Sequence, residues 1–157
     1  PGSDGKVFYK EGIFVGYRYY DTKNIAPVFP FGHGLSYTTF KYSCLKITPA
    51  AASAKAPKVT VTATITNTGR RDGKEAVQLY VRDVVASVPR PVHELKGIRK
   101  ISLKPGESKK VVFMLDSSAF SFFDPATNKW KAEPGKFIIQ LGSSSRDIRL
   151  EGGLMLK

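Results

Sequence analysis

Residues 58–68, KVTVTATITNT, alternate between apolar side chains and polar ones without a break. The apolar set consists of Val59, Val61, Ala63 and Ile65. Because successive side chains of a β-strand point to opposite faces, this period of two predicts a strand with one buried face. No other stretch of the chain constrains the fold as strongly.

A second alternating stretch, EAVQLYVR at 75–82, follows closely. The side chains expected to point inward are Val77, Leu79 and Val81. Those expected to point outward are Gln78, Tyr80 and Arg82. The glycines and aspartate of GRRDG, at 69–73, are turn residues. The two stretches therefore predict an antiparallel β-hairpin.

The remainder of the chain reads as further short strands with turns between them. They are expected at 95–103, 109–115, 137–141 and 148–156. Pro89 and Pro91 interrupt the ladder and predict an ordered loop before the first of these. No amphipathic helical pattern of ten or more residues is evident. Strands at this spacing predict an all-β antiparallel sandwich.

The net charge of +12 suits an anionic partner, but its distribution argues against nucleic acid. Basic residues are spread along the chain, and no nucleic-acid-binding motif accompanies them. The densest stretch, 96–110, is interpreted as a solvated face, with an anionic-ligand site as the alternative. No apolar run is long enough to span a membrane, and no signal-peptide pattern is evident. Cys44 is the only cysteine and is expected to be buried.

The first forty residues differ from the rest, since aromatic residues and glycines predominate and only one short strand pattern, around 12–19, is found. Leaving so many aromatic side chains in water is costly. We expect this segment to pack along the sandwich or on a neighbouring domain.

YKEGIFVGYRYYD and APVFPFGHGLSYTTFKY, with the blocks that follow them, resemble the C-terminal part of glycoside hydrolase family 3 enzymes, chiefly β-glucosidases. The resemblance covers about residues 8–151. It implies an immunoglobulin/fibronectin type III-like sandwich over 38–157. Residues 1–37 would be the C-terminal tail of a missing α/β sandwich domain together with the interdomain joint.

The resemblance also implies a parent enzyme that hydrolyses terminal β-D-glucosyl residues with retention, and a secreted or periplasmic location. β-Xylosidases share this architecture, so glucoside and xyloside specificity both stay open. The catalytic Asp and Glu of such enzymes would lie upstream of this chain. A retaining pair needs two carboxyl groups roughly 5–5.5 Å apart, whereas Asp83 and Glu94, for example, are expected to be solvated at strand or loop ends. We therefore predict no catalytic residue, cofactor or metal ligand, His93 included, because it has no second His nearby.

The stretch FPFGHGLSYTTF, at 29–40, contains a histidine and a serine three residues apart, as an active site would. It lacks the G-x-S-x-G elbow and a third group to orient the histidine. We interpret it as a joint in which His33 is a hydrogen-bonded interdomain residue, and Arg18 as stacking on, or pairing with, a group of the missing domain. The candidates for interdomain docking are Phe14, Tyr17, Arg18, Phe29, Phe31, His33, Tyr37 and Phe40.

Two functions follow from these observations. The preferred one is a non-catalytic structural module whose partners are the catalytic domains of the same parent chain. The alternative is a module that binds plant cell-wall polysaccharide or lignin through a basic and aromatic face. Its candidate residues are Lys96, Arg99, Lys100, Lys109, Lys110 and Trp130. Trp130 is either a sugar-stacking platform or, as we prefer, a hairpin residue packed over the sheet.

Overall fold

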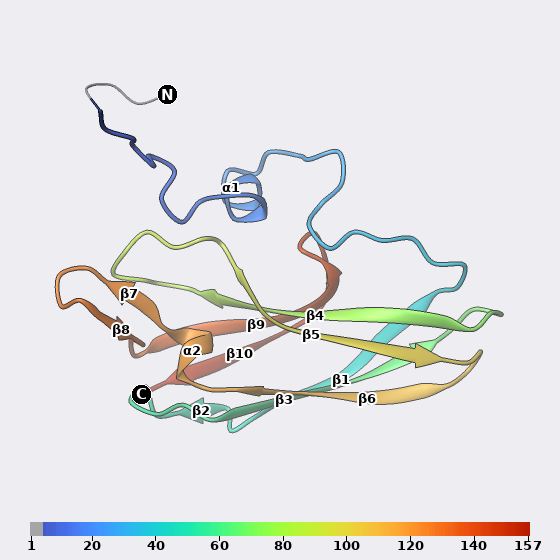
Figure 1. Ribbon diagram of the computed structural model, residues 1–157. Helices are drawn as coiled ribbons and strands as arrows, with labels where there is room; N and C mark the ends of the chain where they lie inside the picture. Colours follow the sequence, from blue (N-terminus) through green and yellow to red (C-terminus); the bar gives the residue numbers. More distant parts are fainter. Residues whose placement is uncertain (1–4) are drawn as a thin grey trace.

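A computed structural model describes residues 5–157, in which two β-sheets pack face to face (Figure 1). The smaller sheet has the strand order β1-β3-β6 and the larger one β2-β10-β9-β4-β5. Their bounds are β1 Phe40–Thr48, β2 Ala51–Ala52, β3 Val59–Asn67, β4 Gly73–Asp83, β5 Glu94–Leu103, β6 Ser108–Leu115, β9 Gly135–Ser144 and β10 Asp147–Leu156. Apart from β2, which runs parallel to β10, the pairs are antiparallel. The predicted all-β sandwich is confirmed.

Three small elements complete the fold. The hairpin of β7 (Phe122–Asp124) and β8 (Lys129–Lys131) projects at one end of the sandwich. Helix α2 (Ser117–Phe120) begins after Asp116, whose carboxylate accepts a hydrogen bond from the main-chain N–H of Ser118 at 2.9 Å. Such a cap satisfies a donor that the first turn of a helix leaves unpaired. The single turn of α2 places the ring of Phe120 against the core.

The core lies between the two sheets. The apolar face predicted for 58–68 is confirmed, since its four members are buried on β3. The inward set of β4 is buried as well, and it faces the apolar side chains of the smaller sheet, which includes β3 and β6. Phe120 meets Phe137 edge to face, with ring centroids 5.3 Å apart. Such pairing adds to the gain from burying the rings.

One local prediction was incomplete and two were wrong. Gln78 and Tyr80 face away from the core as expected, yet both are buried because the N-terminal segment covers that side of β4. Cys44 is exposed, with a φ of 54°, where an irregularity between Ser43 and Lys46 interrupts the alternation of β1. The strand pattern around 12–19 gives way to helix α1 (Tyr17–Thr22).

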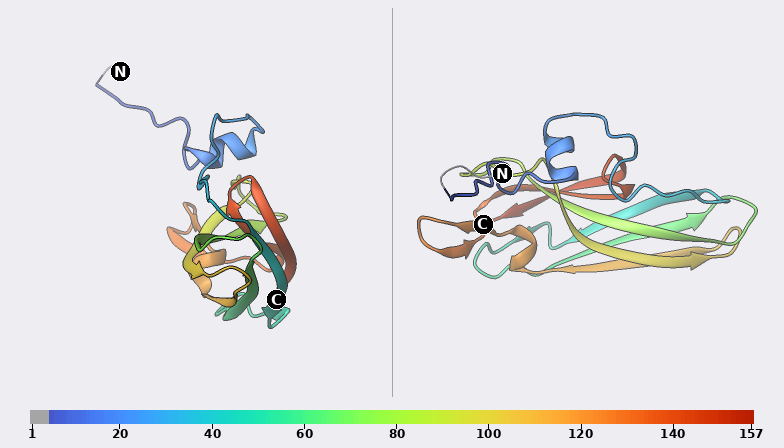
Figure 2. Two further views of the ribbon diagram at one scale, coloured as in Figure 1. Left: turned by 90° about the vertical axis from the view of Figure 1, so that its right-hand side faces the viewer. Right: turned by 45° about the horizontal axis from the view of Figure 1, so that its top comes forward.

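In the N-terminal segment, residues 5–39, helix α1 and the chain after it lie over the outer face of the larger sheet, whereas the first residues extend away from the sandwich (Figure 2). Helix α1 sits above this sheet, and residues 23–39 return across its edge to β1 (Figure 1). The predicted N-terminal segment along the sandwich is therefore confirmed. The domain boundary after residue 37 stays a prediction, although the first strand begins nearby at Phe40. Among residues 5–157, no helix is long and apolar enough to cross a membrane.

Candidate docking site on the N-terminal segment

A carboxylate of α1 fastens the N-terminal segment to the sandwich. The Oδ1 atom of Asp21 accepts a hydrogen bond from Nε of Arg146 at 2.6 Å, and Oδ2 lies 3.3 Å from Nε2 of His93. Arg146 belongs to the turn between β9 and β10, and it also donates to the main-chain oxygens of Tyr20 (3.0 Å) and Ile25 (2.8 Å). One guanidinium group therefore binds both the end of α1 and the chain beyond it.

Aromatic rings fill the space beside this ion pair. The ring of His93 lies 4.7 Å from that of Tyr80, and its Nδ1 is 3.0 Å from Oε1 of Gln140. Tyr17 stacks on Phe31 at 4.7 Å, and its hydroxyl accepts a hydrogen bond from the main-chain N–H of Leu95 at 2.8 Å. Burial raises the pKa of Tyr80 far above its ordinary value, so this hydroxyl stays neutral.

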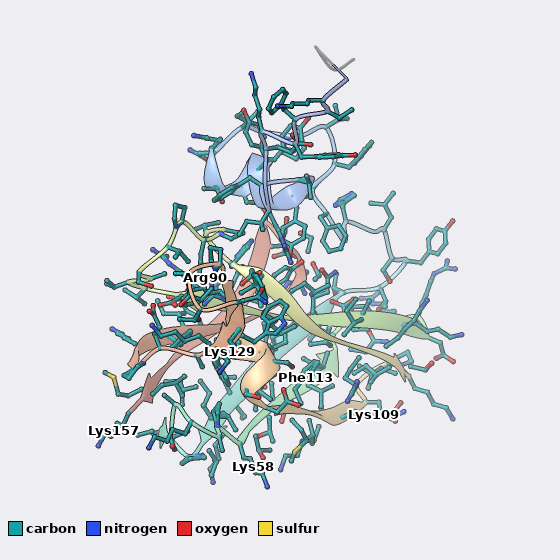
Figure 3. The ribbon with its side chains drawn as sticks, turned by 60° about the vertical axis from the view of Figure 1, so that its left-hand side comes forward. Lys58, Arg90, Lys109, Phe113, Lys129 and Lys157 are labelled. Carbon is teal, nitrogen blue, oxygen red and sulfur yellow. The ribbon has the colours of Figure 1, made fainter. Side chains whose placement is uncertain are left out.

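A second cluster of charges surrounds Arg90, in the loop between β4 and β5 (Figure 3). Its guanidinium lies 3.1 Å from a carboxylate oxygen of Asp83 and 2.6 Å from one of Glu94. Arg18 of α1 and Lys96 of β5 approach Glu94 at 3.4 and 3.7 Å. The prediction that Asp83 and Glu94 are solvated was wrong, because the Pro-rich loop folds Arg90 back between them.

The electrostatics of this cluster follow from burial and pairing. Burial raises the pKa of Asp83 above its usual value, despite the neighbouring Arg90. Burial acts on Glu94 in the same direction, but the hydrogen bond from Arg90 and three nearby cations outweigh it, so the pKa of Glu94 is lowered. Burial also lowers the pKa of Lys96. Glu94 is thus the carboxylate whose charged form the neighbouring cations stabilise.

Several apolar side chains of the segment after α1 face solvent. Leu35 and Tyr37 are each 93% exposed, and Val28 and Phe29 are also largely exposed. The ring of His33 stacks on Phe29 with centroids 5.4 Å apart. Several large apolar side chains that are close in sequence are thus exposed to water, on a segment whose helix is bound to the sandwich.

Some of the predicted docking residues contact the sandwich, and others are exposed. Tyr17 and Arg18 contact the sandwich through Leu95 and Glu94, and Phe40 packs against its core. Arg18 was expected to meet a group of a missing domain, and its partner in the structure is a carboxylate of this chain. The exposed candidates are Phe29, His33 and Tyr37, whereas Phe14 is half-buried and Phe31 is exposed in part. Their docking to another domain stays a prediction.

Sequence reasoning missed the residues that hold the segment. Asp21, His93 and Arg146 come from three distant parts of the chain, with 125 residues separating the first from the last. No local pattern marks such a set. Within the described part of the chain, no group of three or more His, Cys, Asp or Glu residues is arranged to hold a metal ion.

The candidates for polymer binding do not form one patch. Lys96 takes part in the ion network, and Arg99 lies over the ring of Phe113 at 5.5 Å. Lys100 faces outward from the larger sheet and Lys110 from the smaller one, on opposite sides of the sandwich. Lys109 pairs with Glu107 at 3.1 Å and lies well away from Lys129, the neighbour of Trp130, in Figure 3.

Trp130 differs from our preferred interpretation of it. It lies on the β7–β8 hairpin and is not packed over a main sheet. Its ring meets Phe123 edge to face, with centroids 5.8 Å apart, and the greater part of it faces solvent.

Comparison with known proteins agrees with the architecture. Residues 75–145 match the family model of the fibronectin type III-like domain. The thermostable β-glucosidase B of Acetivibrio thermocellus is 52% identical over 151 residues, which are 96% of this chain and 20% of that protein. An exo-α-(1→6)-L-arabinopyranosidase of Bifidobacterium breve is 50% identical over 148 residues, covering 94% of this chain and 19% of that protein.

A solved structure extends the comparison to three dimensions. The glycoside hydrolase family 3 β-glucosidase of Bifidobacterium adolescentis superimposes with a TM-score of 0.91 and 47% sequence identity, over 99% of this chain and 23% of that one. Sandwich and family match together define a fibronectin type III-like module. More particularly, the chain corresponds to this module, with the segment before it, in glycoside hydrolase family 3 β-glucosidases. It spans about a fifth of the length of the curated relatives that it matches.

Proposed function

We propose that this chain is a non-catalytic docking module of a longer β-glucosidase, and that its N-terminal segment binds the catalytic domains of the same polypeptide. The observation that carries the proposal is the contrast between two parts of that segment. Asp21 and Arg146 hold its helix to the sandwich, while Leu35 and Tyr37, further along the segment, are almost fully exposed.

The energetics favour a partner on the exposed side. Removing apolar surface from water contributes about 25 cal/mol per Å². Contiguous apolar surface on a rigid support is typical of an interaction site. The chain also spans only about a fifth of the length of its relatives. The other domains of such a protein would be covalently linked to this segment and are therefore the expected partner.

The buried carboxylates support the absence of a catalytic role within the described residues. Asp21 is paired with Arg146, and Arg90 lies between Asp83 and Glu94. A retaining glycosidase needs one carboxylate free to attack and one acid free to donate a proton. The cations instead bind these oxygens as parts of the fold.

For the complete protein we infer hydrolysis of terminal β-D-glucosyl residues with retention, in a secreted or periplasmic enzyme. The names of the relatives support glycosidase activity, and the arabinopyranosidase among them shows that one module accompanies more than one substrate class. Substrate choice is therefore assigned to the domains outside this chain.

An assay with a chromogenic aryl β-glucoside tests the proposal. It compares the isolated 157-residue chain with the complete enzyme. We expect turnover by the complete enzyme and none by the isolated chain. Turnover by purified chain, retained after removal of any contaminating enzyme, would overturn the proposal.

A further inference from the structure

A groove of about 790 Å³ lies between the β7–β8 hairpin and the loop that joins β4 to β5. Its lining does not include Leu35 and Tyr37, the exposed apolar residues of the N-terminal segment. Residues of α2, β5 and α1 complete its lining. Its volume falls within the range of sites that bind small molecules.

The hairpin provides an aromatic wall. Trp130 is 72% exposed and Phe123 is 47% exposed, and their rings meet at an interplanar angle of 72°. Pro125, Val88 and Pro89 extend the apolar lining. Exposing a tryptophan to this extent forgoes the gain that its burial would bring, so the exposed ring is available to a ligand.

The other part of the groove is polar. Arg18, Glu94 and Lys96 line it, and each of them keeps some exposed surface. They belong to the network around Arg90, in which three cations face the carboxylates of Asp83 and Glu94. The network holds these groups in fixed positions, so that their remaining donors are oriented before any ligand arrives.

We propose that this groove binds a pyranose ring of a neutral oligosaccharide. A pyranose has an apolar C–H face, which fits the ring of Trp130, and hydroxyl groups at its edge, which fit the Arg18 and Lys96 donors. A neutral ligand leaves the ion pairs of the network intact, whereas an added charge would compete with them. The choice of a sugar over other ring compounds rests on the proposed function. The shape and the polarity of the groove are observations that do not depend on the proposed function.

The chain contains a single tryptophan, so emission excited selectively from tryptophan, and not from the seven tyrosines, reports on this groove alone. The experiment titrates the 157-residue chain, which encloses its own core, with cellotetraose. We expect a saturable change in Trp130 emission with a Kd on the order of 1 mM. Phe123→Ala and Arg18→Ala should each weaken binding about tenfold, the equivalent of one good contact. Lys109→Ala, far from Trp130, is the matched control and should bind normally.

Circular dichroism of each variant separates lost binding from lost folding. Emission that does not change with cellotetraose, or a response to phenol without one to cellotetraose, would overturn the inference. A response that Phe123→Ala and Arg18→Ala both leave intact would overturn it too. Docking is measured separately, by the stability of the complete enzyme with Tyr37→Asp. A module that docks without binding sugar contradicts only this inference, and one that binds sugar without docking contradicts only the proposed function.

Discussion

The Oδ1 atom of Asp21 and the Nε atom of Arg146 lie 2.6 Å apart, although 125 residues separate the two in the chain. The carboxylate of Asp21 is only 5% exposed, and His93 approaches its other oxygen. A buried pair of this kind is costly to break, because the remaining partner keeps an uncompensated charge. The N-terminal segment is therefore part of the folded module.

Replacing this carboxylate should loosen the segment. We expect Asp21→Ala to lower the free energy of unfolding by about 2–3 kcal/mol and to speed proteolysis within residues 23–39. Urea unfolding and limited trypsin digestion measure the two effects. Asp72→Ala is the control, since Asp72 is exposed. Equal stability and equal digestion of the two variants would contradict the assignment.

The lowered pKa of Glu94 predicts a dependence of stability on acid. Because the folded-state pKa lies below the ordinary glutamate value of 4.5, Glu94 contributes stability that is present above this pH and is lost as pH falls through the folded-state pKa. Asp83, whose pKa is raised, acts in the opposite direction. Glu94→Gln should therefore be less stable than the parent at neutral pH, by about 3 kcal/mol.

Measuring the stability of Glu94→Gln at lower pH tests the role of the Glu94 charge more directly. The difference in unfolding free energy between the parent chain and Glu94→Gln should narrow as the pH falls below 4.5 and through the lowered folded-state pKa of Glu94, because Glu94 is then protonated. Urea unfolding at a series of pH values measures it. A difference that stays constant over this range would show that Glu94 is not the group whose charge stabilises the network.

Two of the three cations around Glu94, Arg90 and Lys96, should differ in their effect. Arg90 bonds two carboxylates and the main-chain oxygen of Phe120, so Arg90→Met should cost about 3 kcal/mol. Lys96 is 3.7 Å from Glu94, and its burial disfavours the charged form. Lys96→Met should change stability by less than about 1 kcal/mol, or increase it. Equal losses, measured by urea unfolding, would contradict this distinction.

Gly97 lets the edge of β5 approach the core. A Cβ atom at this position would lie 2.8 Å from Cδ1 of Phe113, a buried ring. Gly97→Ala should destabilise the chain by roughly 1–3 kcal/mol, because the ring has to move within a packed core. Gly34→Ala, with no atom within 4 Å of the added methyl group, should have little effect on the melting temperature. A similar melting temperature for both variants would be evidence against close packing at Gly97.

Alternation predicts only those parts of the fold that depend on neighbours along the chain. The apolar face of β3 was predictable because Val59, Val61 and their partners carry the period themselves. The outward residues of β4 follow the same rule, but their burial depends on a segment more than forty residues earlier. Cys44 was predicted wrongly because an irregularity in β1 changes the face on which the next side chain lies.

In the candidate site, too, sequence patterns predict what depends on neighbouring residues and miss what depends on distant ones. The aromatic composition of 29–40 led us to predict a joint, since apolar side chains need cover, and docking to another domain stays a prediction. Which of them face the sandwich is decided by Asp21, His93 and Arg146, which meet only in the folded chain. Similarly, Asp83 and Glu94 lie at strand ends, where carboxylates are usually solvated, until the Pro-rich loop places Arg90 between them.

The most direct test of the docking module is Tyr37→Asp, made both in the isolated chain and in the complete enzyme, with the melting temperature measured for each. Tyr37 is exposed in the chain alone, so we predict little change there. In the complete enzyme we predict a lower melting temperature, because the substitution would bury an unpaired charge against the catalytic domains. An unchanged melting temperature in both proteins would contradict docking through this surface.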